Sequence, residues 1–307
     1  MELDHLEALL AIVQRGGVTR AAATLHLSQP AISRRLHLLE HELGAALFER
    51  IGRSFVLTEA GRAFLPHAQT VLAALHDGRE AVRALREPTR GTVTLALVGT
   101  LAGSSLTRAL SGFRKRHPGI DLRLRTGLSA EVSELVRAGD AALGLRYRSD
   151  ADRELSYQQL FDERMVVVCS PGSPLARKSR VAAETLTQER WIAFPPRPGR
   201  APEPYANALH QRLAANGLGN AEIIPIDSLS AQKRMVEAGF GLALMPESSV
   251  VEELRTKTLC ILRAPSLHAS VPVMLVRRRR AYTSGAMQAL EKLLRKEALR
   301  AERHARP

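Results

Sequence analysis

The sequence predicts an α/β protein with three parts: a winged helix-turn-helix at residues 1–58, one long helix at 59–87, and a two-lobed domain at 88–307. Three patterns support this division. Two short helical segments meet at a tight turn in the first part, a heptad repeat runs through the second, and strand and helix periodicities alternate in the third. A chain of 307 residues is long enough for two or three hydrophobic cores.

The first part begins with a supporting helix and continues as the helix-turn-helix. Leu6, Leu9 and Val13 form one face of the supporting helix, which Gly16 ends. Alanines at 21, 22 and 23 would allow close helix approach, and the next segment starts at Ser28, a good N-cap residue. The outward face of this second segment carries Pro30, Ser33, Arg34, His37 and His41. This arrangement indicates a helix-turn-helix that presents a polar surface.

Basic residues gather around these helices without opposing acids. No acidic residue lies between Glu7 and Glu40, although this stretch contains four arginines. The following run, 47–57, brackets Gly52 with Arg50 and Arg53, which predicts a short basic hairpin. A phosphate backbone would therefore meet no repulsion along this surface.

Residues His5 to Leu72 resemble the N-terminal domain of LysR-type transcriptional regulators. The matching positions keep the family's spacing without gaps; they are Ala21, Ala22, Leu27 to Ser33, Leu39, Glu40, Leu43, Gly44, Leu47 to Arg50, Arg53 and Leu57 to Gly61. The remaining chain has the length and element order of this family, so the resemblance covers essentially the whole sequence. It implies a DNA-binding transcriptional regulator and not an enzyme.

The implied partner is double-stranded DNA. We expect Gln29, Ser33 and Arg34 to approach base edges in the major groove, with Pro30 on the same face. We expect Arg35, Arg50 and Arg53 to meet phosphates or the minor groove. RNA polymerase is a further partner if the protein is an activator.

A heptad repeat indicates how two copies would meet. Apolar residues recur at alternating spacings of four and three from residue 57 to residue 85; they are Leu57, Gly61, Phe64, Ala68, Val71, Leu75, Gly78, Val82 and Leu85. A helix packed on its own domain would also be apolar on one face, but so long an unbroken heptad favours a seam between two helices. We therefore expect a homodimer, with a bend near Pro66. The family resemblance adds a homotetramer.

The third part alternates strands and helices, which predicts a parallel sheet in each of two lobes. Lobe I is expected to comprise 91–162 and 269–307, with strands near 93–97, 120–124 and 141–145. Lobe II is expected to comprise 163–268, with a first strand at 165–169. This part resembles the periplasmic-binding-protein-like effector domain of the family, in which two lobes enclose a cleft.

The effector residues are expected where strands end and helices begin, because free N–H groups there suit anions. These residues are Thr100, Leu101, Ser129, Phe194 and Ser228. Each hydroxyl taken alone is better explained as the cap of its own helix, so the convergence of these residues on one cleft is what supports a site. No acidic cluster is evident for a cation, so we expect a small organic anion as effector. The stretch Pro195 to Pro204 holds five prolines and two arginines and fits a rigid surface loop or a lid.

Charge distribution and the motifs that are missing narrow the function further. The net charge is +13, but the first 90 residues hold 11 arginines and 10 acids, so bulk charge does not locate the DNA-binding part. We read Arg277 to Arg280 as a solvated strand end, not a second nucleic-acid patch. No motif of a hydrolase, metalloprotease or phosphate-binding loop is present, so neither catalytic residues nor metal ligands nor a cofactor are predicted.

Three further expectations concern chemistry and location. Cys169 and Cys260 lack metal or disulfide spacing, so we expect small buried hydrophobic residues and not a redox sensor. Apolar runs are too short to span a membrane and the first residues lack a signal-peptide pattern, which favours the cytoplasm. The alternative function is an effector-insensitive repressor or architectural DNA-binding protein, although such a protein would not need two lobes.

Overall fold

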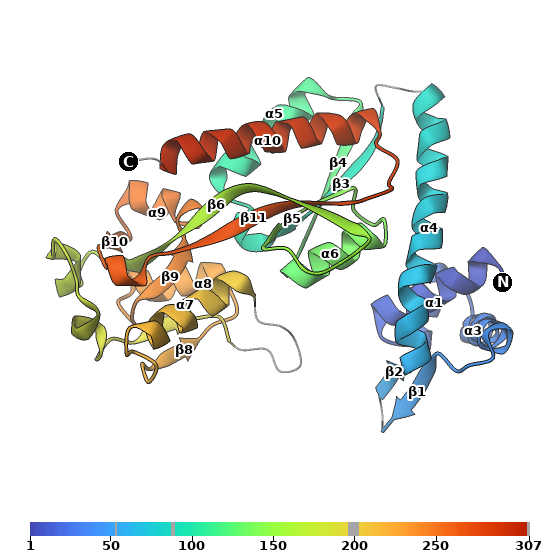
Figure 1. Cartoon of the computed structure of the whole chain (residues 1–307), viewed down its shortest axis with the longest axis horizontal. Helices are drawn as coiled ribbons and strands as arrows, with labels where there is room; N and C mark the ends of the chain where they lie inside the picture. Colours follow the sequence, from blue (N-terminus) through green and yellow to red (C-terminus); the bar gives the residue numbers. More distant parts are fainter. Residues whose placement is uncertain (53, 87–89, 196–202, 306–307) are drawn as a thin grey trace.

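Figure 1 shows a small helical domain connected by one long helix to an elongated α/β domain. This computed structural model describes residues 1–52, 54–86, 90–195 and 203–305. Arg53, residues 87–89 of the expected hinge and most of the proline-rich stretch lie outside the described residues.

The N-terminal domain is a helix-turn-helix followed by a two-stranded wing. Its elements are α1 (Leu3–Arg15), α2 (Val18–Leu25), α3 (Gln29–Leu43), β1 (Phe48–Ile51) and β2 (Ser54–Leu57). Ala21 and Ala22 are buried where α2 meets its neighbours, as the alanine run predicted. His26 adopts a left-handed conformation with φ 55°, which makes the turn between α2 and α3 tight.

Side chains fix the orientation of α3 relative to the wing. The Ser28 hydroxyl accepts a hydrogen bond from the Ala31 N–H at 3.3 Å, which confirms the predicted N-cap. At the other end of α3, the Glu40 carboxylate accepts from the N–H groups of Leu47 (2.7 Å) and Phe48 (3.3 Å). These hydrogen bonds attach the start of the wing to the C-terminal part of α3.

Helix α4 (Glu59–Arg86) begins against this wing, and Gly61 makes the contact close. The Thr58 hydroxyl accepts from the Gly61 N–H at 3.0 Å and donates to the Ala46 carbonyl at 2.7 Å. A Cβ on Gly61 would lie only 2.1 Å from the Leu47 carbonyl oxygen. Only glycine allows this approach of helix and wing.

Gly61→Ala should therefore destabilise the N-terminal domain by about 1–3 kcal/mol, the usual cost of overpacking a tight contact. The variant's first thermal unfolding transition should fall below that of the parent. Gly112→Ala is the matched control, because a Cβ on this helical glycine meets only the flexible end of Arg116 at 3.8 Å. Equal midpoints for the parent and Gly61→Ala would contradict the prediction.

The two halves of α4 are packed differently. Phe64 and Ala68 join the hydrophobic core of the N-terminal domain, so this half follows the own-domain alternative. Further along, Val71 is 46% exposed and Val82 is 58% exposed. The helix continues through Pro66. The heptad therefore has an exposed apolar face only in its second half.

The second half of α4 also touches lobe I. Ala73 is buried against Gly139, whose Cβ position would lie 3.0 Å from the Ala73 Cβ. Asp77 accepts from the Arg278 guanidinium at 2.7 Å and from the Tyr282 N–H at 3.2 Å. The expected solvated arginine end is therefore wrong for Arg278, whose largely buried charge is paired with an acid 201 positions away. Sequence spacing contains no signal for such a pair.

Lobe I is built around a parallel arrangement of three strands. Its elements are β3 (Gly91–Val98), a 3₁₀ turn (Gly99–Leu101), α5 (Ser104–Arg116), β4 (Ile120–Gly127), α6 (Ser129–Arg137) and β5 (Leu143–Tyr147). Strand β3 pairs in parallel with β4 on one side and β5 on the other, as predicted. Helix α6 covers one face, while α5 and the C-terminal α10 (Gly285–Ala305) lie together on the other (Figure 1).

Two long strands connect the lobes. Strand β6 (Leu155–Cys169) pairs antiparallel with β11 (Ala269–Arg278) along its first part. Its last residues pair antiparallel with β9 (Ala243–Pro246) and β10 (Cys260–Leu262). The sequence predicted only residues 165–169 of β6. The earlier half contains Gln158, Gln159 and Asp162 in this connecting ribbon, so hydropathy did not reveal it.

Lobe II surrounds the far end of β6. Its main elements are β7 (Trp191–Ala193), α7 (Pro204–Ala215), β8 (Ile223–Pro225), α8 (Leu229–Glu237), β9 (Ala243–Pro246), a 3₁₀ turn (Glu247–Ser249), α9 (Val251–Thr256) and β10 (Cys260–Leu262). Strands β7 and β8 are parallel, and further 3₁₀ turns lie at Pro174–Arg177, Ala183–Leu186 and Pro265–Leu267. The prediction of wholly parallel sheets is wrong, because the strands that cross between lobes run antiparallel to their neighbours.

Two local predictions need comment. Strand β5 lies two residues later than predicted because Arg146 and Tyr147 are buried in it, and a buried arginine breaks the hydropathy pattern. Cys169 and Cys260 are free, yet they are direct cross-strand partners of β6 and β10. Burial raises the pKa of Cys169 to about 11, which suppresses its thiolate.

Candidate DNA-binding surface and effector cavity

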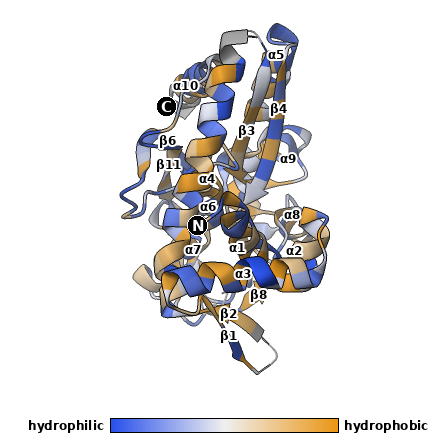
Figure 2. Ribbon diagram, turned by 90° about the vertical axis from the view of Figure 1, so that its right-hand side faces the viewer, coloured by the Kyte–Doolittle hydropathy of each residue, from blue (hydrophilic) through white to orange (hydrophobic). Residues whose placement is uncertain are grey.

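The exposed face of α3 carries the residues predicted to read DNA bases. Gln29, Pro30, Ser33 and Arg34 are all exposed on this helix. Figure 2 faces this domain: α3 lies across the front, with the wing of β1 and β2 below it. Arg50 is exposed on β1, and Arg53 lies outside the described residues. The outward face of α3 and the wing thus both present polar side chains to solvent.

The two neighbouring arginines of α3 differ in their surroundings. Arg35 is partly buried and donates to the Asp4 carboxylate of α1 at 2.5 Å. Arg34 is exposed and makes no ion pair with the described residues. Arg34 can thus turn toward a base without breaking a contact, whereas Arg35 would have to leave Asp4 or hold both it and a phosphate.

A cavity of about 770 Å³ lies between the two lobes. Ends of strands and starts of helices from both lobes form its wall, as the sequence predicted for open parallel sheets. The described lining residues from lobe I are Val98, Gly99, Thr100, Thr126, Gly127, Leu128 and Glu131. Those from lobe II are Phe194, Pro195, Glu203, Tyr205, Ala206, Asn207, His210, Asp227, Leu229 and Ser230.

The five residues predicted to bind the effector are placed differently relative to this cavity. Thr100 and Phe194 line it. Leu101 is buried in the core of lobe I, and Ser228 caps α8 by accepting from the Ala231 N–H at 3.4 Å. Ser129 lies behind the wall, with only 2% of its surface exposed. The structure thus brings together two of the five side chains at the surface of the cavity.

The inner wall is aromatic. Thr100 Oγ1 lies 3.0 Å from the Tyr147 hydroxyl, and Tyr205 contacts both Tyr147 (5.2 Å between ring centroids) and Phe194 (5.3 Å). Burial, together with the nearby Glu163 carboxylate, raises the pKa of Tyr147 well above its ordinary value. Tyr147 therefore keeps its proton and offers a neutral hydroxyl behind Thr100.

The polar part of the wall includes three carboxylates. Glu131, Glu203 and Asp227 all line the cavity, and His210 is the one titratable base among its described lining residues. Sequence patterns did not single out these three carboxylates, although none of the described acids belongs to a group that could hold a metal cation. The three acids come from the start of α6, the start of α7 and the loop before α8, which are far apart in sequence.

The start of α6 already holds a carboxylate from the opposite lobe. The Ser129 N–H donates to Glu203 Oε1 at 2.5 Å, and the Ser129 hydroxyl donates to Glu203 Oε2 at 2.8 Å. The preceding N–H, that of Leu128, donates to Glu131 at 2.9 Å. Burial raises the pKa of Glu203, and the charge of Glu131 acts in the same direction.

A second buried carboxylate lies on the crossing strand. Glu163 of β6 accepts from the Ser248 N–H at 3.2 Å and from the Ser248 hydroxyl at 2.9 Å. Burial is the main reason that its pKa is raised above the ordinary value. The protonated form is therefore favoured by folding, and its ionisation opposes folding.

The pH dependence of stability follows from this sign. A raised pKa contributes stability below the ordinary glutamate pKa, and that contribution is lost as pH rises through the raised value. Glu163→Gln cannot ionise, so its thermal midpoint should fall less than the parent's between pH 4.5 and pH 8. Glu252→Gln, an exposed change, is the control. Parallel pH profiles for Glu163→Gln and the parent would contradict this prediction.

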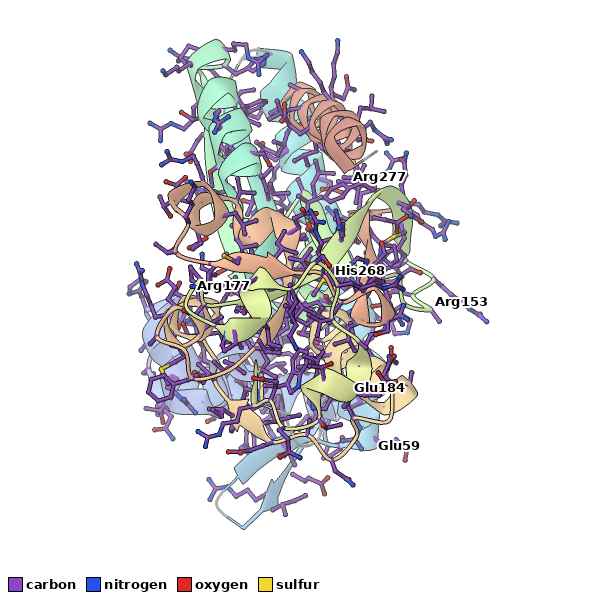
Figure 3. The ribbon with its side chains drawn as sticks, turned by 90° about the vertical axis from the view of Figure 1, so that its left-hand side faces the viewer. Glu59, Arg153, Arg177, Glu184, His268 and Arg277 are labelled. Atoms are coloured by element: carbon purple, nitrogen blue, oxygen red, sulfur yellow. The ribbon has the colours of Figure 1, made fainter. Side chains whose placement is uncertain are left out.

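A buried charge network supports α6 from behind. Arg146 donates to Ser133 at 2.6 Å and pairs with Asp150, while Arg137 pairs with Asp152. Figure 3 shows that Arg153, in the same loop, instead points away from the molecule. The buried arginine positions α6, whose first turn forms the cavity wall. No sequence pattern identified this network or Glu203.

Two other kinds of site are not found in the described part of the chain. No group of histidine, cysteine and acidic side chains there could hold a metal ion. None of the described helices combines the length and apolar character needed to cross a membrane.

Comparisons with known proteins agree with this architecture. Residues 86–299 match the family described as LysR substrate binding domain, and residues 3–62 match that described as bacterial regulatory helix-turn-helix protein, lysR family. A RuBisCO operon transcriptional regulator from Allochromatium vinosum is 28% identical over 300 residues, covering 98% of this chain and 97% of that protein.

Solved structures share the fold along the whole chain. Full-length CbnR complexed with its target DNA has a TM-score of 0.62 and 23% identity, covering 97% of this chain and 100% of that chain. Full-length LysG from Corynebacterium glutamicum with bound effector Arg has a TM-score of 0.60 and 20% identity, with coverages of 98% and 99%.

Proposed function

Since the chain belongs to the LysR family of transcriptional regulators, we propose that α3 and the wing bind its operator and that a small molecule in the cavity changes regulation. The observation that carries this proposal is the 770 Å³ cavity at the strand ends of both lobes. A ligand there contacts both lobes, so it favours one relative arrangement of them. Lobe I in turn contacts α4 through Asp77 and Arg278.

We propose that the effector is a small organic anion with one carboxylate. The support is local: the start of α6 already binds a carboxylate through the N–H and hydroxyl of Ser129. The other walls carry Glu131 and Asp227, which would repel a second negative charge. The remainder of the effector should therefore be neutral or positively charged, with an apolar part against Phe194 and Tyr205.

The parts of the chain would divide this work as the sequence suggested. We propose that residues 1–58 bind DNA, 59–87 form the dimer helix, and 88–307 bind the effector. Lobe I would comprise 91–162 and 269–307, and lobe II 163–268. A homodimer would assemble into a tetramer, act in the cytoplasm where DNA is found, and contact RNA polymerase if it activates transcription.

A thermal-shift screen of the full chain tests the effector class. Monocarboxylates, dicarboxylates, amino acids and simple amines should be compared at equal ionic strength. A ligand at 100 times its dissociation constant stabilises by about 2.7 kcal/mol, which a thermal midpoint resolves. We expect stabilisation by members of the monocarboxylate or amino-acid sets. Sequence-specific operator binding with no response to any compound would favour the effector-insensitive repressor instead.

A further inference from the structure

We propose that Glu203 is a built-in occupant of the carboxylate subsite, which an effector must displace in order to bind. This inference rests on the proposed function, because it concerns the same cavity. It assigns a competing role to a side chain of lobe II that lies directly before α7.

The geometry of the contact is that of a bound carboxylate. Each Glu203 oxygen takes one donor from Ser129, at 2.5 Å from the backbone N–H and 2.8 Å from the hydroxyl. Both donors belong to Ser129, the first residue of α6. This helix has nine residues, and its dipole favours negative charge at this end. A free carboxylate would use the same two donors in the same way.

The Glu203 carboxylate and an effector carboxylate cannot occupy the Ser129 subsite at the same time. Ser129 is almost fully buried, while Glu203 itself lines the cavity. A molecule in the cavity therefore meets Glu203 first and reaches the Ser129 donors only when the Glu203 carboxylate has moved. The apparent affinity for a carboxylate is then reduced by the fraction of molecules in which the subsite is open.

A purely structural role does not require a carboxylate at position 203. Its carboxylate is largely removed from water and lies near Glu131, and both effects disfavour the ionised form. A neutral amide could accept one of the Ser129 hydrogen bonds without this cost. The Ser129 hydrogen bonds and the charge of Arg146 stabilise the ionised form, and burial and Glu131 oppose them, so the carboxylate is bound against an opposing cost, as a reversible competitor would be.

Displacement would also break a connection between the lobes. Glu203 belongs to lobe II and Ser129 to lobe I, so their hydrogen bonds join the two lobes across the cavity. An effector carboxylate on Ser129 would replace these hydrogen bonds, and the lobes would then be connected through the ligand. Binding would thus change the relative placement of the lobes, which is the signal that reaches α4.

Chemical rescue with acetate tests this competition in the full-length protein. Glu203→Ala removes the internal carboxylate, so acetate should raise the variant's thermal midpoint in a saturable way relative to sodium chloride of equal ionic strength. The parent should show a shift at least several-fold smaller at each concentration. Glu252→Ala is the matched control, because it removes an exposed carboxylate of α9 from the same lobe. It should behave as the parent does.

A second pair of variants separates rescue from general salt effects. Adding Ser129→Ala to Glu203→Ala should weaken the acetate response, because the hydroxyl donor is lost. If Glu203→Ala does not fold, Glu203→Gln keeps the shape but has one acceptor oxygen where the carboxylate uses two, so it should hold Ser129 less firmly and respond to acetate more than the parent does. Equal acetate responses in the parent, Glu252→Ala and the Glu203 variants would overturn the proposal. Operator binding is measured separately, so the proposed function and this competition can fail independently.

Discussion

Val71→Asp should convert the full-length protein from a dimer to a monomer. Val71 is 46% exposed on the second half of α4. It belongs to the same heptad face as Gly78 and the exposed Val82. On a symmetric seam each aspartate would face its own copy, and an uncompensated buried charge costs about 3–5 kcal/mol. This raises the dimer dissociation constant at least about 100-fold. Sedimentation velocity across a range of concentrations measures the change.

The control for this prediction is an equally exposed valine elsewhere. Val251 is 47% exposed at the start of α9, so Val251→Asp adds the same charge to a similar surface. It should leave the oligomer unchanged. If Val71→Asp sediments as the parent does, α4 does not form the seam that its heptad predicts.

Arg34→Ala should weaken binding to the operator by about 1–3 kcal/mol, or roughly 5- to 150-fold, and should change binding to random DNA little. The reason is that Arg34 is exposed at the outward face of α3 and makes no ion pair with the described residues, so it is available for bidentate contact with a base. Fluorescence anisotropy with operator and scrambled duplexes at fixed salt measures both affinities.

Arg35→Ala provides the contrast. Arg35 is partly buried and paired with Asp4, so it is less free than Arg34 to turn toward a base, and we expect it to contact phosphate as the sequence predicts. Its loss should weaken operator and scrambled duplexes alike and reduce the salt dependence of binding by about one unit of slope. A similar loss on both duplexes for Arg34→Ala would remove its assignment to base reading.

The N-terminal domain could be predicted almost completely, because its signals are local. Ser28 caps α3, Ala21 and Ala22 of α2 are buried, and the wing turns at Gly52, and each of these features depends on residues close to it in sequence. Helix caps, turns and short periodicities depend on neighbouring residues, and such features are readable from a single chain.

The cavity could be predicted only in position. Strand ends of both lobes do form its wall, but its charge depends on Glu131, Glu203 and Asp227, which folding brings together from distant segments. The pairing of Glu203 with Ser129 spans 74 positions and that of Arg278 with Asp77 spans 201. Neither pairing leaves a periodic or spaced pattern in the sequence, so hydropathy and motif reasoning could not find them.

The central claim is that this protein binds DNA and that an effector changes how it binds. The most direct test is a footprint on the DNA upstream of its own gene. The full-length protein should protect a defined site, and the compound that stabilises it most in the thermal-shift screen should change the protected length or the pattern of enhanced cleavage. The same compound should leave the footprint of a cavity-filling variant, Ala206→Trp, unchanged, because Ala206 lines the cavity. An identical footprint of the parent protein with and without the compound would contradict the account.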